Sequence, residues 1–361
     1  MKKNIYIGFV GLTHLGLSYL AASTEKGFRV VGVDLNKKKV NKLKKFEIEY
    51  NEPYLKKIIY KNKKKIIFSS NLNTLINCHI VFISQDINTD KKGKSDYKNL
   101  KALINSVSEL LSKKTIMVIL SQVKPGFTRT INFDSSRLYY QVETLVFGNA
   151  LKRAIKPERF IIGCENSLSK INHLYMNYLF KFNCPIIKMN YESAELAKIS
   201  INLILSSTIN TTNILAEVCE KINANWNKIV PALQLDKRIG KHAYIKAGLG
   251  ISGGNLERDI KTIIEVNKKY KISSEFFKSI LSHSKKRKKW VWEKLTSLGV
   301  IKKNKLKIAI LGLAYKENTN SIKNSPAIEL INKLVNKHYI AAYDPAVPNN
   351  IKSKNFKRVL S

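Results

Sequence analysis

A glycine-rich stretch at residues 247–259, AGLGISGGNLERD, holds the residues in this sequence that are best suited to approach a ligand. It contains Gly248, Gly250, Gly253 and Gly254, and polar and charged side chains follow at once. Glycine lacks a Cβ and tolerates positive φ, so such a run lets backbone amides come close to a bound molecule. We therefore predict that this loop lines a substrate site.

A polar stripe on one long helix is the second candidate. The helix is expected over residues 192–221, where the sequence has neither Gly nor Pro. Polar side chains recur there at spacings of three and four and therefore share one face. These are Glu195, Lys198, Asn202, Ser206 and Asn213. Asn favours helices less than Lys or Glu does, which favours a ligand-facing stripe over the alternative of a solvated face.

A dinucleotide-binding pattern lies near the N-terminus. The apolar run at residues 4–10 predicts a buried strand, and a turn from Gly11 to Gly16 leads into a helix. The N–H groups at that helix start suit a pyrophosphate. Asp34, which ends the next strand, can accept hydrogen bonds from ribose hydroxyls and favours NAD over NADP. Thr13 replaces the middle glycine and would crowd the pyrophosphate, so a plain βαβ unit is the alternative.

Alternating strands and helices in the first half predict an α/β fold with a doubly wound parallel sheet. The strands are expected at 66–69, 80–84 and 115–121, and the helices at 36–46, 53–61 and 96–112, with a polar loop at 86–95. A basic helical stretch is expected at 257–293, followed by a strand–helix–strand unit up to Tyr343. We expect three domains: a Rossmann-type domain at 1–190, a central all-α domain at 191–295, and an incomplete, Rossmann-like C-terminal βαβ domain at 296–361.

The composition indicates a folded, strongly basic protein. The chain has 361 residues, 44% of them hydrophobic, and a formal net charge of +38. Such a charge suits nucleic acid, an anionic membrane surface or anionic metabolites. Lysines occur in nearly every segment, so we interpret the charge as compositional and expect no nucleic-acid partner. The basic stretch at 282–292 is interpreted as a surface helix end with two packed tryptophans.

Four cysteines are widely separated and form no CxxC pair or His-containing metal pattern. They are Cys78, Cys164, Cys184 and Cys219. Scattered thiols are typical of reduced, buried side chains in a cytoplasmic protein. No apolar stretch approaches the roughly 18 residues that a membrane span needs. We predict a cytoplasmic protein with no bound metal and no membrane partner.

Motifs along nearly the whole chain resemble those of the UDP-glucose/GDP-mannose dehydrogenase family, the NAD-dependent nucleotide-sugar 6-dehydrogenases. The first are the Gly11/Gly16 turn with Gly32-Val33-Asp34, and Glu52-Pro53 with Leu55. The glycine loop at 247–259 matches another motif of the family in outline. The others are SQVKPGFT at 121–128, Glu143 with GNAL at 148–151 and KPERFIIG at 156–163, AELAKISIN at 194–202, LDKRIG at 235–240 and GLAYKENTNSIKNSP at 312–326.

This resemblance implies an activity. The family oxidises the C6 hydroxymethyl group of a sugar nucleotide to a carboxylate in two hydride transfers to NAD. A cysteine captures the intermediate aldehyde as a thiohemiacetal, and the thioester that follows is hydrolysed. A Lys and an Asn stabilise the oxygen that becomes negative, and a carboxylate manages the protons. A UDP- or GDP-sugar substrate and a homodimer through the 192–221 helix are also implied.

The resemblance assigns site residues by position. Lys198 would stabilise the oxyanion together with Asn202, Glu143 would be the acid/base, and Asn255 and Asp259 occupy catalytic positions of the glycine loop. The cofactor-binding set is Gly11, Thr13, Leu15, Gly16, Asp34, Ser121 and Lys316. The substrate-binding set is Arg238, Gly248, Gly250, Gly253 and Lys323. Lys323 replaces an arginine, and Arg238 would reach the substrate from a neighbouring helix or subunit.

The sequence departs from the family pattern mainly in the glycine loop. Asn255 stands where the family has its catalytic cysteine, and an amide cannot act as the nucleophile. Glu257 and Arg258 stand where Pro and Lys are expected. Elsewhere Gln122 replaces a Thr, Ile214 replaces a Glu, residues 85–88 differ from the cofactor loop, and the chain is shorter than the family pattern.

Three functional hypotheses follow. The first is an NAD-dependent oxidoreductase that performs a single oxidation of a sugar nucleotide, or an alcohol/ketone exchange. The second is a degenerate member that binds a nucleotide or sugar nucleotide without turnover. The third is a basic nucleic-acid-binding protein on a Rossmann scaffold, and it has the least support because the charge follows no stripe.

Overall fold

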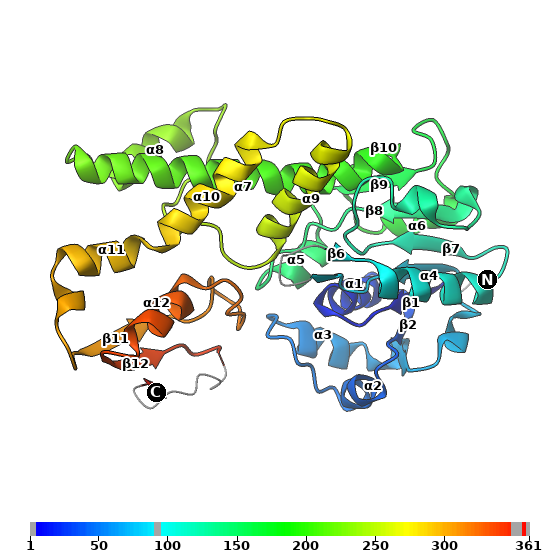
Figure 1. The fold of residues 1–361 in the computed structure, drawn as a ribbon. Coiled ribbons are helices and arrows are strands. Elements are labelled where there is room, and N and C mark those ends of the chain that lie inside the picture. Colours follow the sequence, from blue (N-terminus) through cyan, green and yellow to red (C-terminus); the bar gives the residue numbers. More distant parts are fainter. Residues whose placement is uncertain (1–4, 90–94, 348–355, 359–361) are drawn as a thin grey trace. The chain divides into compact units, whose positions relative to one another are not determined.

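The structure is a computed structural model that describes residues 5–89 and 95–347, and the backbone of 356–358. The chain forms two compact units, the first with residues 1–90 and 95–198 and the second with residues 199–361 (Figure 1). The boundary falls between Lys198 and Ile199, inside one long helix, α7 (Tyr191–Lys221), and this helix lies where one was expected at 192–221. The side chains of α7 before and after this boundary therefore belong to different units.

An eight-stranded sheet forms the centre of the first unit, in the order β10-β9-β8-β7-β4-β1-β2-β3. Its strands are β1 (Tyr6–Val10), β2 (Arg29–Val33), β3 (Ile66–Ser69), β4 (Ile80–Ile83), β7 (Ile116–Ile119), β8 (Leu138–Gln141), β9 (Phe160–Cys164) and β10 (Ile186–Asn190). Neighbouring strands are parallel except β8 and β9, which pair antiparallel. The predicted α/β fold with a doubly wound sheet is confirmed, and the pair β8–β9 departs from the parallel arrangement that was expected.

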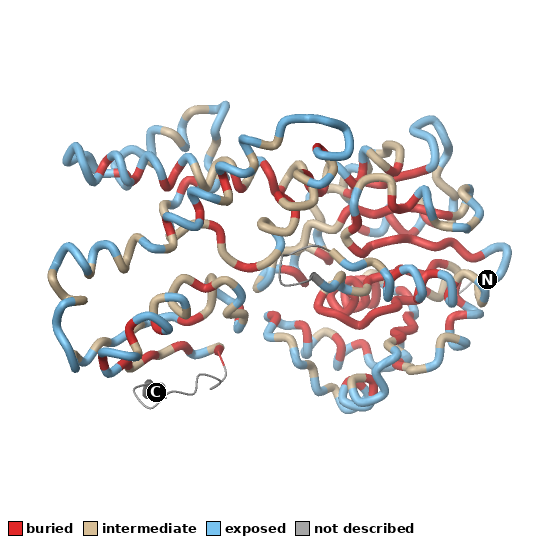
Figure 2. The backbone as a smooth tube through the Cα atoms, viewed as in Figure 1, coloured by how far each residue is buried: buried red, intermediate tan, exposed pale blue. Residues whose placement is uncertain are grey.

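Two hydrophobic cores pack against opposite faces of this sheet. The central strands β1, β4 and β7 are almost continuously apolar and buried, as expected for parallel strands covered on both faces (Figure 2). Phe9 and Phe82 stack in one core, and Val10 and Val81 belong to the other. The helices of this unit are α1 (His14–Glu25), α2 (Lys37–Lys44), α3 (Leu55–Lys61), α4 (Lys98–Leu110), α5 (Ala150–Ile155) and α6 (His173–Phe180).

The polar loop expected at 86–95 is bounded by two short strands, β5 (Asn88–Thr89) and β6 (Ser95–Asp96), which pair antiparallel. Residues 90–94 of that prediction lie outside the described part of the chain. The expectation of an unpaired loop is therefore wrong at its two ends. A two-residue ladder gives too short an alternation to be recognised in a sequence.

The second unit combines helices with a small parallel sheet. The helices are α8 (Trp226–Leu235), α9 (Asn255–Lys269), α10 (Glu275–Lys288), α11 (Trp290–Ser297) and α12 (Pro326–Leu334), and the sheet contains β11 (Lys307–Leu311), β12 (Tyr339–Tyr343) and β13 (Phe356–Arg358). The stretch expected to be helical at 257–293 is interrupted after Lys269, where Lys271 has a positive φ, and again at Lys289. The strand β13 was not predicted from the sequence.

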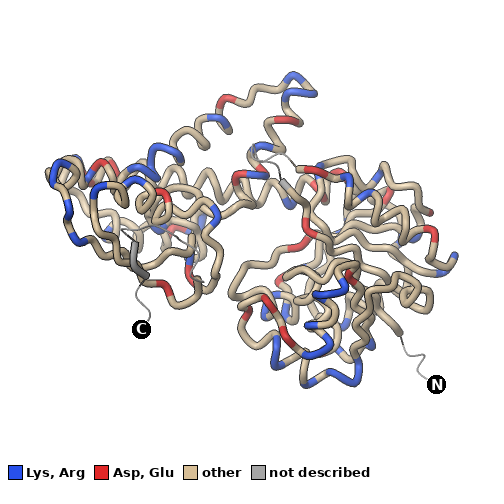
Figure 3. The backbone as a smooth tube through the Cα atoms, turned by 60° about the horizontal axis from the view of Figure 1, so that its bottom comes forward, with Lys and Arg blue, Asp and Glu red and all other residues tan. Residues whose placement is uncertain are grey.

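Lys and Arg residues are spread along the backbone of both units rather than gathered in one segment (Figure 3). In the stretch at 282–292, the Trp290 ring lies between Arg287 and Lys294, at 5.1 and 5.5 Å from its centroid, and its indole N–H donates to Glu220. Trp292 packs against the core of the C-terminal sheet. The prediction of packed tryptophans at a helix end is confirmed.

The cysteines are free thiols, and burial raises the pKa of Cys78 to about 12 and that of Cys164 to about 11. Within the described residues, no three His, Cys, Asp or Glu side chains are grouped in a way that could hold a metal ion. A search of the same residues finds no helix that is both long and apolar enough to cross a bilayer.

Candidate functional site

The turn between β1 and α1 requires glycine at two positions. Gly11 has a φ of +88°, and a Cβ at this residue would lie 2.7 Å from the backbone of Gln85. A Cβ at Gly16 would collide with the carbonyl oxygen of Gly11 and with the Ser84 hydroxyl. The start of α1 is thereby held close to the carboxyl ends of β1 and β4. The N–H groups of its first turn have no partners within the helix, which suits a pyrophosphate.

Thr13 caps helix α1 and does not project its hydroxyl away from the protein. The side chain is 8% exposed; it donates to the carbonyl of Ser84 over 2.9 Å and accepts from the amide of Gly16 over 3.3 Å. Capping of this kind satisfies one of the N–H groups of the first turn. The β-branched side chain of Thr13 is therefore directed to Ser84, the residue that follows β4.

Asp34 lies at the carboxyl end of β2, where a ribose would be bound in a dinucleotide fold. Its carboxylate accepts from the amides of Leu12 and Asn36, each over 3.0 Å, and pairs with Lys39 at 2.9 Å. By contrast, Ser121 is fully buried and donates to the carbonyl of Gln85 over 2.6 Å. Ser121 therefore links the carboxyl ends of β4 and β7. Asp34 and the α1 turn are the groups that fit NAD.

A buried ion pair joins Glu143 and Lys198. Glu143 follows β8 and Lys198 lies on α7; their side-chain atoms are 2.8 Å apart, with side-chain exposures of 13% and 8%. Glu143 also accepts from the amide of Leu145. Two of the predicted catalytic side chains, 55 positions apart in the sequence, are thus brought together in the first unit. A shielded ammonium beside a carboxylate can stabilise a developing oxyanion and pass on its proton.

Glu195, one turn before Lys198 on α7, has a structural role. Its carboxylate accepts from the backbone amides of Gly126 and Thr128, and so anchors the turn at Pro125-Gly126. Burial raises the pKa of Glu195 to about 6, although these amide donors favour the ionised form. The expectation that the whole polar stripe faces a ligand is therefore wrong for Glu195.

In the second unit, Asp259 accepts hydrogen bonds from side chains while it is almost fully buried. It is 1% exposed, and it accepts from the Asn202 amide over 2.5 Å and from the Arg258 guanidinium over 3.2 Å. Asn202 lies on α7, four residues after Lys198, and Asp259 lies on α9. The structure thus joins two more of the predicted catalytic residues, and gives a partner to Arg258, which departs from the family pattern.

The glycine loop is held by its own unit at several points. The amide of Gly248 donates to Asn213 over 2.7 Å, so the polar stripe of α7 does reach this loop. Gly250 has a φ of +83° and packs on Ser284, and Gly253 has a φ of +78° and packs on the ring of Tyr315. At least part of the requirement for glycine in this loop is therefore close packing against the protein.

The start of α9 carries Asn255, which is exposed, as the first residue of the helix. Two residues on, Glu257 pairs with the nearly buried Lys288 at 3.2 Å and accepts from Asn324 over 2.7 Å. Asn324 also donates to the carbonyl of Gly253. This network joins the glycine loop, α10 and the segment before α12. It was not predicted, because the partners are far apart in sequence and share no spacing.

A cavity of about 540 Å³ lies between the glycine loop and the small sheet of the second unit. Residues 248–252 line one side, and the carboxyl end of β11, Tyr315 and the start of α12 line the other. Nucleotides bind at the carboxyl ends of strands in α/β folds. Of the predicted substrate residues, Gly248 and Gly250 line this cavity, and Gly253 and Lys323 adjoin it through their backbone hydrogen bond of 3.0 Å.

Arg238 and Lys316 stand apart from these groups. Arg238 is largely exposed and forms its ion pair with Asp236, two residues before it. The ammonium of Lys316 lies 5.8 Å from the centroid of the neighbouring Tyr315 ring.

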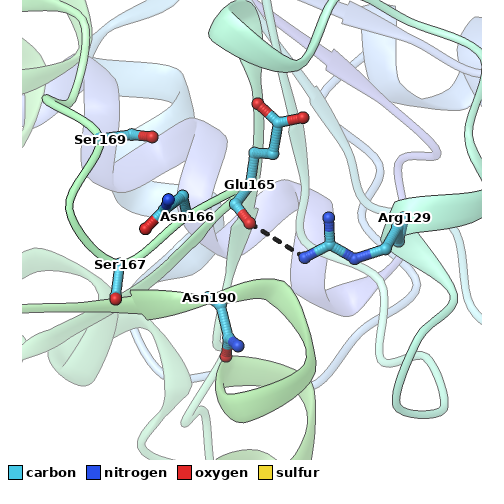
Figure 4. A pocket seen from close by; sticks show the side chains of 6 residues that line it. All are labelled: Arg129, Glu165, Asn166, Ser167, Ser169 and Asn190. Atoms are coloured by element: carbon cyan, nitrogen blue, oxygen red, sulfur yellow. Dashed lines mark hydrogen bonds between the residues drawn. The ribbon is translucent and has the colours of Figure 1, made fainter.

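A second hollow, of about 460 Å³, lies in the first unit and is lined by polar residues (Figure 4). Arg129 donates to the carbonyl of Glu165 and forms a bidentate ion pair with the carboxylate of Glu192. Ser167, Ser169 and other polar side chains complete it. It contains none of the predicted site residues, and its one arginine is already engaged by carboxylate and carbonyl oxygens.

The sequence matches three successive domains of one family. The NAD binding domain of the UDP-glucose/GDP-mannose dehydrogenase family matches residues 5–180, its central domain matches 192–285, and its UDP binding domain matches 309–361. The chain belongs to this family of NAD-dependent nucleotide-sugar dehydrogenases. It is thus an NAD-binding oxidoreductase, as the motifs predicted.

Among individual relatives, the chain is 30% identical over 368 residues to UDP-glucose 6-dehydrogenase of Rickettsia felis, with 96% of this chain and 80% of that protein covered. It is 28% identical over 365 residues to UDP-glucose 6-dehydrogenase TuaD of Bacillus subtilis, covering 96% and 77%. A UDP-glucose dehydrogenase structure from the archaeon Pyrobaculum islandicum has a similar fold, with a TM-score of 0.85, 23% identity, and 96% and 83% coverage.

Proposed function

We propose that this protein oxidises an alcohol of a UDP-sugar with NAD, and that it stops after one oxidation. The observation that carries the proposal is the pairing of predicted catalytic side chains within each unit, together with Asn255 at the thiol position. Glu143 pairs with Lys198, and Asn202 pairs with Asp259. A hydroxymethyl group would lose a hydride and a proton and leave as an aldehyde.

Each polar residue has a definite part in this reaction. NAD, when bound at the α1 turn, supplies the acceptor for the hydride. Lys198 and Asn202 stabilise the negative charge that develops on the substrate oxygen. Glu143, held beside Lys198, receives the hydroxyl proton directly or through water. Oxidation of the aldehyde through a thiohemiacetal would need a thiol, and the amide of Asn255 does not provide one.

The residues that differ from the family pattern have partners in the structure, and this supports an active site over an inactive one. Glu257 and Arg258, which replace Pro and Lys of the family pattern, are both engaged, with Lys288 and Asn324 and with Asp259 respectively. Buried charges left without partners are costly, and substitutions accumulated without selection would leave such groups. The second candidate, a protein that binds a sugar nucleotide without turnover, is favoured by the identity of Asn255.

The cavity beside the glycine loop is the proposed nucleotide site. Its place at the carboxyl end of β11 and at the start of α12 is that of a nucleotide in an α/β fold, and the match to the family's UDP binding domain covers this segment. Lys323 would supply positive charge for the diphosphate. Arg238, exposed in the chain, would meet substrate across a subunit contact.

The first test is NADH formation with a panel of UDP- and GDP-sugars. We expect NADH absorbance at 340 nm with UDP-glucose or another UDP-hexose, and little with GDP-mannose. A shift in melting temperature with UDP-sugars and no NADH would favour the binding-only candidate. Faster turnover with GDP-mannose than with every UDP-sugar would contradict the nucleotide assignment.

We also propose a homodimer through α7. Apolar side chains of this helix, among them Ile204, Leu215 and Val218, are exposed in the single chain, and a row of this kind marks an interaction surface. Sedimentation velocity at micromolar concentration is expected to give twice the mass of one chain. Ile204→Asp should return a monomer, whereas Leu168→Asp, at an exposed leucine outside α7, should not. A monomeric wild type would contradict the proposal.

A further inference from the structure

A buried carboxylate that the proposed reaction does not use lies between two functional segments of the first unit. Glu52, just before α3, is 6% exposed. One of its oxygens lies 2.9 Å from His14 Nε2 and accepts from the amide of Gly148 over 2.9 Å; the other accepts from the amide of Leu151 over 3.2 Å. Three donors from two separate parts of the chain therefore converge on this one side chain.

His14 is the first residue of α1 and belongs to the turn proposed to bind the cofactor. Its ring stacks on Phe147, with centroids 4.2 Å apart and planes inclined by 16°, and meets the edge of Tyr50 at 5.6 Å. The ring is buried, and its Nε2 atom is directed to Glu52. Its rotamer is thus fixed by two aromatic contacts and one charge-assisted hydrogen bond.

The other donors to Glu52 belong to the segment that carries Glu143. Gly148 and Leu151 follow it by five and eight residues, and Phe147 lies between them and Glu143. Glu143 is itself bound to Lys198 and to the amide of Leu145. The Glu52 carboxylate therefore bridges the first turn of α1 and the segment from 143 to 151, two parts of the chain separated by more than 100 residues.

We propose that Glu52 is a positioning residue that sets the distance between the cofactor turn and the Glu143–Lys198 pair. It acts through His14 on one side and through the amides of Gly148 and Leu151 on the other. This rests on the proposed function, in which NAD binds at that turn and Glu143 takes the substrate proton. Glu52 itself touches neither cofactor nor substrate.

The substitution Glu52→Gln changes this bridge with little change in volume. An amide has one acceptor oxygen where the carboxylate has two, so at least one of the three donors loses its partner. The unpaired N–H group would draw the 143–151 segment away from the α1 turn, because a buried donor without an acceptor is unfavourable. A displacement of about 1 Å between reacting groups can lower a rate about 100-fold.

The test is a double-variant cycle with two readouts: NADH affinity from fluorescence titration, and kcat with the UDP-sugar that supports turnover. Glu52→Gln removes the carboxylate, and His14→Phe keeps the stacked ring but removes the donor. We expect each single variant to lower kcat 10- to 100-fold and weaken NADH binding several-fold, while KM for the UDP-sugar changes less than twofold. The double variant should be no worse than the poorer single one. Glu49→Gln, at an exposed carboxylate paired with Lys42, should change neither readout.

The results that would contradict the role of Glu52 differ from those that would contradict the proposed function. Lower thermal stability of Glu52→Gln with unchanged kcat and NADH affinity would overturn the proposal, because Glu52 would then serve stability alone. Independent, multiplying effects of the two substitutions would also overturn it. If the wild type binds NADH but has no turnover, the proposed function fails while the affinity cycle still tests the bridge. A wild type that does not bind NADH would overturn both.

Discussion

Asn255→Cys is expected to change the stoichiometry of the reaction from one NADH per sugar to two. Residue 255 is exposed at the first position of α9, where the positive end of the helix dipole favours a thiolate. A thiolate there can add to the aldehyde carbon and give a thiohemiacetal. Loss of a second hydride to NAD then leaves a thioester, and its hydrolysis by water releases the acid and restores the thiol.

The measurement follows NADH at 340 nm until a limiting amount of UDP-sugar is exhausted, and identifies the product by mass spectrometry. Asn255→Ser is the matched control: it introduces a side chain close in shape to cysteine but without a readily ionised nucleophile, and it should remain at one NADH per sugar. A ratio that stays at one in Asn255→Cys would contradict the assignment of position 255 as the missing thiol.

Lys198→Met is expected to lower kcat by about 100- to 1,000-fold, because a preorganised donor to a developing oxyanion commonly contributes that much. Methionine keeps much of the length of the side chain and removes its charge. NADH affinity should be nearly unchanged, because Lys198 pairs with Glu143, whereas Thr13 and Asp34 hold the α1 turn. The rate is measured with saturating NAD and UDP-sugar.

The same substitution leaves Glu143 buried without its ammonium partner, and removing one member of a buried pair costs about 3–5 kcal/mol of stability. A second variant separates this effect from catalysis. Lys198→Met with Glu143→Gln removes both charges and should recover much of the stability, measured by urea unfolding, while the rate remains low. Recovery of the rate along with stability would contradict the catalytic role of Lys198.

Most of the fold was accessible from the sequence because its strands are short apolar runs separated by clear turn residues. Gly27, with a φ of +94°, follows the end of α1 and separates this helix from β2. Strand direction was not accessible in the same way. β8 and β9 pair through Tyr140 and Gly163 as antiparallel neighbours, and nothing local distinguishes a buried antiparallel strand from a buried parallel one. The short strand β13 also depends on pairing with β12 rather than on its own pattern.

The candidate site was accessible in part. Helical spacing placed Lys198 and Asn202 on one face of α7, and the structure agrees. Spacing gave no information about the partner of each, because Glu143 and Asp259 are brought to them by the tertiary fold. Glu195 shares the same face and yet binds the Pro125-Gly126 turn. A stripe of polar residues therefore does not distinguish a catalytic contact from a structural one.

The bridge at Glu52 was missed for a related reason. The sequence contained Glu52 in a recognisable motif and His14 inside the glycine turn, and neither residue type is unusual there. Only burial and the convergence of His14, Gly148 and Leu151 on one carboxylate distinguish it. A buried acid before a proline was the available signal, and it does not identify the partners.

We propose that the chain is a working dehydrogenase that is limited to one oxidation by the amide at position 255. The most direct test is the NADH yield of the wild-type protein with limiting UDP-sugar and excess NAD, with a carbonyl-trapping reagent to capture the product. We expect one NADH per sugar and a trapped aldehyde. Two NADH per sugar with a uronic acid product, or UDP-sugar binding with no NADH at all, would contradict it.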